Sequence, residues 1–482
     1  MFPVVTESKT DLATSKLIEE LGAVVQVKPS ELYEASFDGL KVQGETGACI
    51  LAKEDEHVGK VLRIANEYGI PITTKGAGSS LTGGATPIRG GWVLDLSNLD
   101  DLFLDEKNRL VRCGPGVVVS TLQAEAEKLG LFYPPDPSSK KFCTIGGNVA
   151  CNAGGLRCVK YGVTRDYVLS LSGYLANGEK VTWGRATRKF ATAYNVRDLW
   201  IGSEGTLGII TEITLRLIER PTKRKTFLGV FANDESALSA PLALSRLGLR
   251  PSILEYMDEW TINCLQEYTG IEVFQGVGAN PTLLIELDGN DSEVAYQAEK
   301  LEAWISKESL AYRFAADDEQ AERLWEVRRQ GSSAMKKLAP TKLNEDIVVP
   351  LDQQIELVRF VNLLREDYHL KIGVFGHCGD GNLHVNFMYD EENQQETARS
   401  VEALSKLMNK VIEMGGAISG EHGVGLAKTP FVREQFNQAE WDLMKKIKKT
   451  MDPKGILNPG KIFEVFKPWE QQKLKVDLHW EK

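Results

Sequence analysis

The sequence lacks several features that would define a protein class. Its 482 residues include seven cysteines, an odd number with no CxxC pair, so we expect neither an iron–sulfur ligand set nor a disulfide framework. No run of about 18 apolar residues predicts a membrane span. A net charge of −10 disfavours a basic face for nucleic acid. The N-terminus shows no basic segment followed by an apolar one, so we expect no secretory signal and a cytoplasmic protein with reduced thiols.

What is present is typical of a globular protein of two or three domains, with 42% hydrophobic and 26% charged residues. A β–α–β rhythm runs to about residue 220. Within it, residues 56–68 predict an amphipathic helix that Gly69 ends, and residues 209–217 predict an alternating strand. Pro221 and the basic TKRK then interrupt the pattern, so we expect a domain boundary at about 220.

Beyond residue 226 the pattern changes to strands and helices of an α+β sheet domain. TFLGVFA at 226–232 and TLLIELDG at 282–289 predict strands, and residues 317–337 predict a charged helix. Residues 439–450 predict a further helix. Its KKIKK run indicates a solvated face near the helix C-terminus, with contact to a membrane surface as the lesser alternative.

Glycine is concentrated in three clusters, at residues 75–84, 134–155 and 202–210. The first, KGAGSSLTGG, follows a predicted strand, and its amides and hydroxyls could surround phosphate oxygens. It is neither a Walker loop nor a GxGxxG turn that opens a helix. The second cluster has the small residues that fit against a flat aromatic ligand. One glycine-rich turn alone is structural about half the time, but the order and spacing of all three together are a strong signal.

In this order and spacing, the clusters resemble those of the PCMH-type FAD-binding flavoproteins of the vanillyl-alcohol-oxidase superfamily. Within it, residues 30–465 are similar to the D-2-hydroxyacid dehydrogenase branch, which includes the glycolate oxidase flavoprotein subunit and D-lactate dehydrogenase. The resemblance implies an α+β fold. A PCMH-type FAD-binding domain at 1–220 would precede an α+β cap domain at 221–482, which binds substrate and metal and whose C-terminal segment returns to the flavin. The implied activity is FAD-dependent oxidation of glycolate or D-lactate to the 2-oxoacid.

The resemblance also implies which residues contact FAD. Residues 75–84 match the pyrophosphate loop, 134–155 the stretch beside the ribityl chain and isoalloxazine, and 202–210 the adenine side. Ser79 stands where some relatives attach FAD through histidine, so we expect non-covalent FAD. The expected contacts are Lys75, Gly76, Gly78, Ser79, Ser80, Thr82, Gly83, Pro135, Asp136, Thr144, Gly147, Asn148, Gly154, Gly155, Glu204, Gly205, Ile210 and Asn458.

Histidines gather at residues 377–422. Strand periodicity puts His384 and Asn386 on one face, and a glycine-rich turn brings His377 near. Two imidazoles and the carboxylate of Glu421 are a common ligand set for a divalent metal. Any one of these histidines alone reads as a polar loop residue. The resemblance implies that His377, His384 and Glu421 bind the metal, zinc or manganese, between which spacing does not decide.

The resemblance implies that Asn386 and His422 face the substrate. His422 is the candidate base because histidine titrates near neutral pH, and its alternative role is that of a hydrogen-bond donor. Arg328 matches the arginine that binds the substrate carboxylate, although without the resemblance it reads as a charge on a surface helix. Its neighbour Arg329 is expected to face solvent.

One departure concerns the substrate. Relatives that act on D-2-hydroxyglutarate carry a lysine where this chain has Asn344, and a threonine where it has Ser332. Losing the lysine favours a monocarboxylate over D-2-hydroxyglutarate, although a D-2-hydroxyglutarate dehydrogenase stays possible. An oxidase that uses O2 and a flavoprotein subunit of a multi-subunit glycolate oxidase complex are rival functions for the same residues. The electron acceptor would be a quinone or an iron–sulfur subunit, and a homodimer is one option for the assembly.

Overall fold

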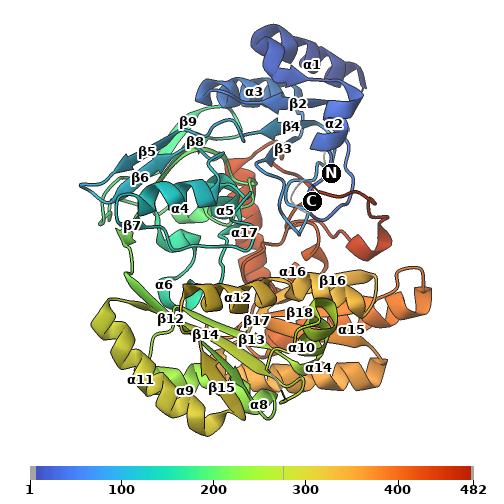
Figure 1. Cartoon of the computed structure of the whole chain (residues 1–482). Coiled ribbons are helices and arrows are strands. Elements are labelled where there is room, and N and C mark those ends of the chain that lie inside the picture. Colours follow the sequence, from blue (N-terminus) through green and yellow to red (C-terminus); the bar gives the residue numbers. More distant parts are fainter. Residues whose placement is uncertain (1–6, 275, 479–482) are drawn as a thin grey trace. The chain divides into compact units, whose positions relative to one another are not determined.

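The computed structural model describes residues 7–274 and 276–478, which form two compact units (Figure 1). The first unit holds the chain up to Gly154, Val163–Arg220 and the chain from Glu421 onward, and the second holds Gly155–Gly162 and Pro221–Gly420. The chain passes from one unit to the other at Gly155, Val163, Pro221 and Glu421. Residues 421–478, expected to follow the cap domain as a C-terminal segment that returns to the flavin, belong to the first unit. The expectation of no secretory signal concerns the N-terminus, whose first six residues lie outside the described residues.

A four-stranded sheet begins the first unit. Its order is β1 (Val25–Gln26), β2 (Ala48–Leu51), β4 (Trp92–Asp95) and β3 (Ile72–Lys75), with β2, β4 and β3 parallel. Helix α3 (Asp55–Tyr68) buries Val58, Val61, Leu62 and Ala65 and ends at Gly69, whose φ of 75° is left-handed. The predicted helix is thus confirmed. Leu457 forms a parallel bridge with Ile72, so the C-terminal segment extends this sheet at β3.

The second sheet of this unit is antiparallel. Its order is β5 (Leu102–Asp105), β6 (Leu110–Cys113), β10 (Ile209–Arg216), β8 (Val168–Tyr174) and β9 (Lys180–Gly184). The strand predicted at 209–217 is confirmed as β10. The remaining elements are α1 (Glu7–Leu21), α2 (Pro29–Ala35), α4 (Val119–Glu127), β7 (Leu131–Phe132), α5 (Ile145–Cys151), α7 (Arg197–Trp200), β11 (Ile218–Glu219), α16 (Thr429–Gln435) and α17 (Gln438–Met451).

Helix α17 departs from one expectation about charge at a single residue. The KKIKK run was expected to be a solvated face, and Lys445, Lys446 and Lys449 are exposed, but the Lys448 side chain is only 18% exposed. Its ammonium donates to the carbonyl oxygens of Thr206 and Leu457 and pairs with Asp452 at 2.6 Å. Burial lowers the pKa of Lys448. This lysine therefore joins the helix to the segment that extends β3.

The second unit is built on a seven-stranded antiparallel sheet. Its order is β15 (Ala311–Phe314), β12 (Lys223–Val230), β14 (Thr282–Gly289), β13 (Ile253–Met257), β17 (Lys371–His377), β18 (Asn382–Tyr389) and β16 (Thr341–Val348). Its helices are α6 (Cys158–Tyr161), α8 (Asp234–Leu238), α9 (Ala240–Arg246), α10 (Glu259–Thr269), α11 (Asp291–Glu308), α12 (Asp318–Arg329), α13 (Gly331–Ala334), α14 (Gln354–Tyr368) and α15 (Gln394–Glu413).

The single helix expected over 317–337 is wrong. Asp317 caps α12, which ends at Arg329, and the chain passes through Gln330 into the short helix α13. The break falls at Gln330, and the Gly-Ser-Ser that follows, although it stabilises a helix poorly, forms most of α13.

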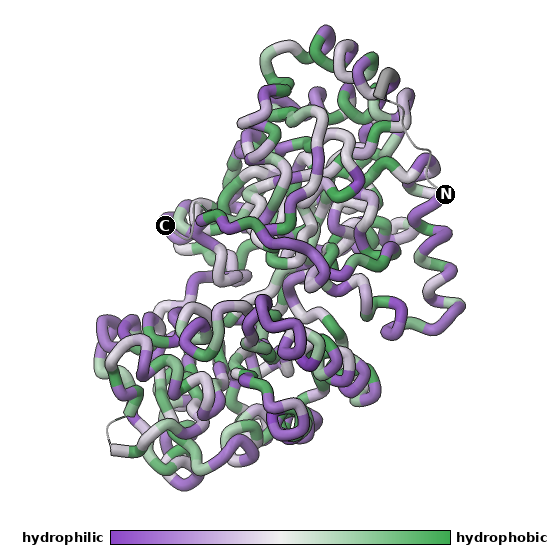
Figure 2. Tube along the Cα trace, turned by 90° about the vertical axis from the view of Figure 1, so that its right-hand side faces the viewer, coloured by the Kyte–Doolittle hydropathy of each residue, from purple (hydrophilic) through white to green (hydrophobic). Residues whose placement is uncertain are grey.

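Hydrophobic and hydrophilic residues alternate along the helices (Figure 2). Among the described residues, no helix is both long and apolar enough to cross a membrane.

Candidate functional site

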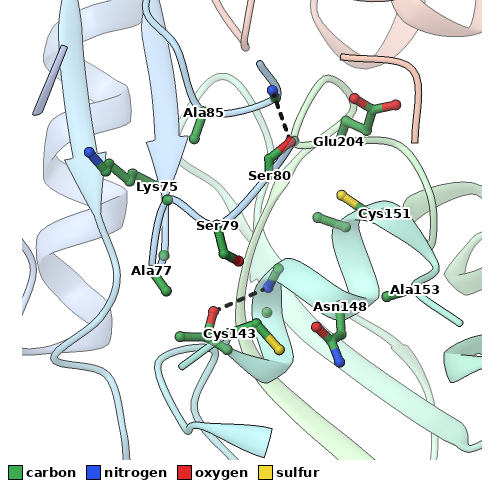
Figure 3. Close-up of a pocket in the computed structure, with 18 of the residues that line it drawn as sticks. Lys75, Ala77, Ser79, Ser80, Ala85, Cys143, Asn148, Cys151, Ala153 and Glu204 are labelled. Atoms are coloured by element: carbon green, nitrogen blue, oxygen red, sulfur yellow. Dashed lines mark hydrogen bonds between the residues drawn. The ribbon is translucent and has the colours of Figure 1, made fainter. Parts of the chain in front are cut away.

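A cavity in the first unit brings the three glycine clusters together (Figure 3). Most of the expected FAD contacts line it: Lys75, Gly76, Gly78, Ser79, Ser80, Thr144, Gly147, Asn148, Gly154, Glu204, Gly205 and Ile210. Glu421 and His422 line it as well. The first cluster follows β3, the second opens α5, and the third leads into β10, so each cluster lies at the end of a regular element.

Close packing explains the glycine content of the cavity wall. A Cβ on Gly76 would lie 2.5 Å from Thr144 Oγ1, so a larger residue would push the first cluster away from the second. Gly78 has a left-handed φ of 67°. The Lys75 side chain points away from the cavity and donates to the carbonyl oxygens of Glu34 and Phe37 (Figure 3). Lys75 therefore contributes its backbone, not its ammonium, to this wall.

Two buried polar atoms of the wall fit a polar ligand. Thr74 Oγ1 and Asn148 Nδ2 have no hydrogen-bond partner within the described part of the chain, and both residues line the cavity. A buried donor or acceptor without a partner costs about 1–3 kcal/mol. A nucleotide cofactor with carbonyl, hydroxyl and phosphate oxygens would supply such partners. The donors and small residues present thus fit FAD.

Glu204 fixes the segment that carries Glu421 and His422. Its carboxylate accepts hydrogen bonds from the backbone N–H of Val424 at 2.8 Å and of Gly425 at 2.7 Å. Burial raises the pKa of Glu204, and these two bonds oppose the increase. His422 Nε2 lies 3.9 Å from Glu421 Oε1. Glu204 therefore attaches the segment to the cavity wall at Val424 and Gly425, directly after the ionisable residues Glu421 and His422.

The other expected FAD contacts do not line the cavity. Thr82 and Asn458 support it instead, since the Thr82 carbonyl accepts from Leu426 N and Asn458 Nδ2 donates to the carbonyls of Gly84 and Glu204. The remaining ones are Gly83, Pro135, Asp136 and Gly155. The Pro135 carbonyl accepts a hydrogen bond from Gln123 Nε2, and Asp136 Oδ2 lies 3.8 Å from Lys140 Nζ. Gly155 belongs to the second unit.

In the second unit, the two predicted metal-binding histidines lie together. His377 ends β17 and His384 lies on β18, and their ring centroids are 5.2 Å apart. A ligand nitrogen of His377 and one of His384 lie within 4.8 Å of each other. Both residues are buried, with exposed fractions of 7% and 6%. Neutral imidazoles at this separation can bind one divalent ion.

Glu255 of β13 is a functional candidate that the sequence reasoning missed. Its Oε1 is hydrogen-bonded to His377 Nδ1, and its Oε2 accepts from Arg328 Nε at 2.9 Å and Nη2 at 2.5 Å. Glu255 is fully buried, and the charges of His377 and Arg328 lower its pKa against the opposing effect of burial. The one signal was an acidic residue in an otherwise apolar strand, ILEYM.

The contact with Glu255 changes what Arg328 can do. One edge of the guanidinium, Nε and Nη2, is engaged by the carboxylate, and the group stacks on the Phe375 ring at 4.6 Å. Only the Nη1 side is left for a further acceptor. Arg328 is 8% exposed, whereas the Arg329 side chain is 53% exposed and pairs with Glu322.

Asn386 and Asn344 face each other across β18 and β16. Asn386 is fully buried, and its Nδ2 donates to the carbonyl oxygens of Gly373 and His384. The Oδ1 atoms of both asparagines have no partner among residues 7–274 and 276–478. Asn344, the position expected to affect substrate choice, therefore lies beside Asn386 on one face of the sheet.

The chain itself links Glu421 to this sheet. Gly420, the last residue of the second unit, donates its N–H to Asp346 Oδ2 at 3.0 Å. Asp346 is the cross-strand neighbour of His384. One peptide bond separates Gly420 from Glu421, so their Cα atoms are about 3.8 Å apart. Of the three expected metal ligands, His377 and His384 belong to the second unit, and Glu421 is the first residue of the C-terminal segment of the first unit.

Family models match both parts of the chain. Residues 47–184 match the FAD binding domain, and residues 220–462 match the FAD linked oxidases, C-terminal domain. The chain is 38% identical to glycolate oxidase subunit GlcD of Bacillus subtilis (strain 168), with 91% of this chain and 96% of the relative covered. It is 35% identical to D-lactate dehydrogenase of Anaerostipes hadrus, with 89% and 92% covered.

Solved structures support the fold. p-Cresol methylhydroxylase with substrate bound superimposes with a TM-score of 0.80 at 18% identity, over 96% of this chain and 99% of that one. An alkyldihydroxyacetonephosphate synthase has a TM-score of 0.71 at 17% identity, with 95% and 86% covered. The expected order of a flavin-binding domain and a second α+β domain is thereby confirmed.

Proposed function

The chain belongs to the FAD-linked oxidases, and from this premise we propose that it oxidises a small D-2-hydroxyacid, glycolate or D-lactate, to the 2-oxoacid. The observation that carries the proposal is 38% and 35% identity, over about nine tenths of the chain, to relatives named for glycolate and D-lactate. The enzyme is an FAD-dependent oxidoreductase of small hydroxyacids. The choice between the two substrates, and the D configuration, are part of the proposal.

Oxidation requires the chain to hold the cofactor and to remove the hydroxyl proton. Bound FAD would accept the hydride from the substrate Cα. His422 lines the cofactor cavity, and we assign it the hydroxyl proton, because a neutral imidazole can accept a proton near pH 7. Its alternative role is to donate a hydrogen bond to the substrate. The attachment of its segment to Glu204 restricts the directions in which the imidazole can point.

Two further groups complete the proposed site. His377, His384 and Glu421 would bind a divalent metal, zinc or manganese, which would stabilise charge on the hydroxyl oxygen. Two close buried imidazoles support this ligand set. Arg328 would contact the substrate carboxylate through Nη1, and Asn386 would face the substrate. FAD would be held without a covalent bond, because Ser79 has no nucleophilic nitrogen.

The electron acceptor in this proposal is a quinone or an iron–sulfur subunit. None of the seven cysteines, all within the described residues, forms a disulfide, and in sequence none forms a CxxC pair, so this chain would pass its electrons to another molecule. The second candidate function, a flavoprotein subunit of a larger complex, is favoured by similarity to relatives named as glycolate oxidase subunits. Free thiols also support a cytoplasmic location. A homodimer remains one option for the assembly.

Anaerobic dye reduction with glycolate, each lactate enantiomer and D-2-hydroxyglutarate tests the proposal. A second carboxylate buried beside Asn344 without a cation would cost several kcal/mol, and each 1.4 kcal/mol is about tenfold in kcat/KM. Glycolate or D-lactate should therefore exceed D-2-hydroxyglutarate by at least about 100-fold. Comparable turnover of D-2-hydroxyglutarate would overturn the argument from Asn344. Absence of reduction by every hydroxyacid would overturn the function.

A further inference from the structure

We propose that Lys461 is a positioning residue for the cofactor: its ammonium fixes residues 84–86, where the first glycine cluster ends, and FAD binds most tightly while this lysine is charged. The inference rests on the proposed function only in its cofactor. Lys461 is 3% exposed and belongs to the same unit as the first and third glycine clusters. The proposed reaction assigns no role to this buried cation.

Residues 84–86 are each hydrogen-bonded to one buried side chain from a distant segment. The Gly84 carbonyl accepts from Asn458 Nδ2 at 2.9 Å, the Ala85 N–H donates to Asp38 Oδ2 at 3.0 Å, and the Thr86 carbonyl accepts from Lys461 Nζ at 2.7 Å. Gly84 and Ala85 line the cofactor cavity. Lys461 therefore acts on the cavity wall through the chain that it holds.

Asn458 extends this effect to the third glycine cluster. Lys461 Nζ donates to Asn458 Oδ1 at 3.3 Å, so the lysine also orients the asparagine. The Nδ2 of the same asparagine donates to the carbonyl oxygen of Glu204 at 2.8 Å, and Glu204 lines the cavity. Asn458 itself is 2% exposed. One buried ammonium is thus connected to two parts of the wall that are far apart in sequence.

Charge explains why a cation is needed at this position. Asp38 is 1% exposed and Glu204 is 7% exposed. Burial raises the pKa of both carboxyl groups, and the charge of Lys461 opposes the increase in each. A buried charge that loses its partner is costly. Loss of the proton from Lys461 would therefore disfavour the arrangement that these carboxylates share, and the neutral amine would donate more weakly to Thr86.

Cofactor binding should consequently be coupled to a proton. Burial lowers the pKa of Lys461 to about 8, against the charges of Asp38, Glu204 and Glu464. Of the other charged groups in this region, Arg89 pairs with Glu464 and Lys428 acts on Glu204. The diphosphate of FAD adds negative charge, which favours the protonated lysine. FAD binding then takes up a proton above about pH 8, so the affinity falls as the pH rises.

The test measures free FAD in equilibrium with the full-length flavoprotein, by ultrafiltration at several pH values. Uptake of one proton predicts that the wild type binds FAD about tenfold more weakly at about pH 9 than at about pH 7. Lys461→Met removes the charge and should bind FAD weakly at every pH in this range. Lys461→Arg keeps the charge throughout, because a guanidinium does not lose its proton there, and should show no decline.

Lys448→Met is the matched control. Lys448 is a second poorly exposed lysine of the same unit, and its ammonium pairs with Asp452. This variant should keep the wild-type decline with pH, since Lys461 is intact. Far-UV circular dichroism at each pH checks that every variant stays folded.

The outcomes separate this proposal from the proposed function. A wild-type affinity that does not change with pH would overturn the proposal, and so would an equal decline in Lys461→Met. If Lys461→Arg does not retain FAD, the comparison of the wild type with Lys461→Met decides. A wild type that binds no FAD at any pH would overturn both the cofactor and the role of Lys461. Absence of hydroxyacid oxidation would overturn the proposed activity alone, because the affinities are measured without substrate.

Discussion

One substitution, Glu204→Gln, measures how much the hydrogen bonds of Glu204 contribute to the free energy of unfolding. The carboxylate accepts from two backbone N–H groups, of Val424 and Gly425. A glutamine has one carbonyl oxygen, so its NH2 group would face one of these donors. A hydrogen bond to a charged acceptor contributes about 1.5–3 kcal/mol. We therefore expect the free energy of unfolding of the first unit to fall by about 2–3 kcal/mol.

Urea unfolding followed by the release of flavin fluorescence measures this loss. Glu212→Gln is the control, because Glu212 belongs to the same unit but is 46% exposed and lies 3.6 Å from Arg112, where an ion pair contributes at most about 1 kcal/mol. Turnover should also fall in Glu204→Gln, since the segment that carries His422 loses one attachment. Equal unfolding midpoints for both variants would refute the reasoning.

Two further outcomes are expected. Acid precipitation should release the flavin into a yellow supernatant, because Ser79 cannot form the covalent link, and flavin retained in the pellet would contradict this. Burial lowers the pKa of Lys461 to about 8 from its ordinary 10.5. Because the unfolded chain binds more protons between these values, stability relative to Lys461→Met should rise with pH across that window, by up to about 3 kcal/mol. A stability difference that stays constant from about pH 8 to about pH 10 would contradict this expectation.

Elements that are determined by residues close in sequence could be predicted from the sequence. The helix at 56–68 follows from its apolar period and the left-handed Gly69. The pair of histidines was predicted because strand period and a glycine turn determine which side chains meet. The single helix over 317–337 was overextended, because the charge pattern gave no sign of the break at Gln330 between α12 and the short helix α13.

Residues that depend on distant partners were not predictable in this way. Lys448 reads as a surface charge, and only the folded chain brings the carbonyls of Thr206 and Leu457 to its ammonium. Glu255 lies 122 residues from His377 and 73 from Arg328, so no spacing could connect them. The resemblance to a family supplied the ligand set, but it named neither of these two residues.

The bridge between Ile72 and Leu457 has a consequence for the growing chain. Until Leu457 is synthesised, β3 presents an open edge in the first unit, next to the glycine cluster that follows it. At about 5–20 residues per second, the chain from Arg220 to its end takes roughly 10–50 s to make. During synthesis, the sheet of the first unit therefore stays incomplete at β3 while the second unit folds. A truncation before Leu457 would leave that edge open permanently, and its unpaired backbone groups would favour aggregation.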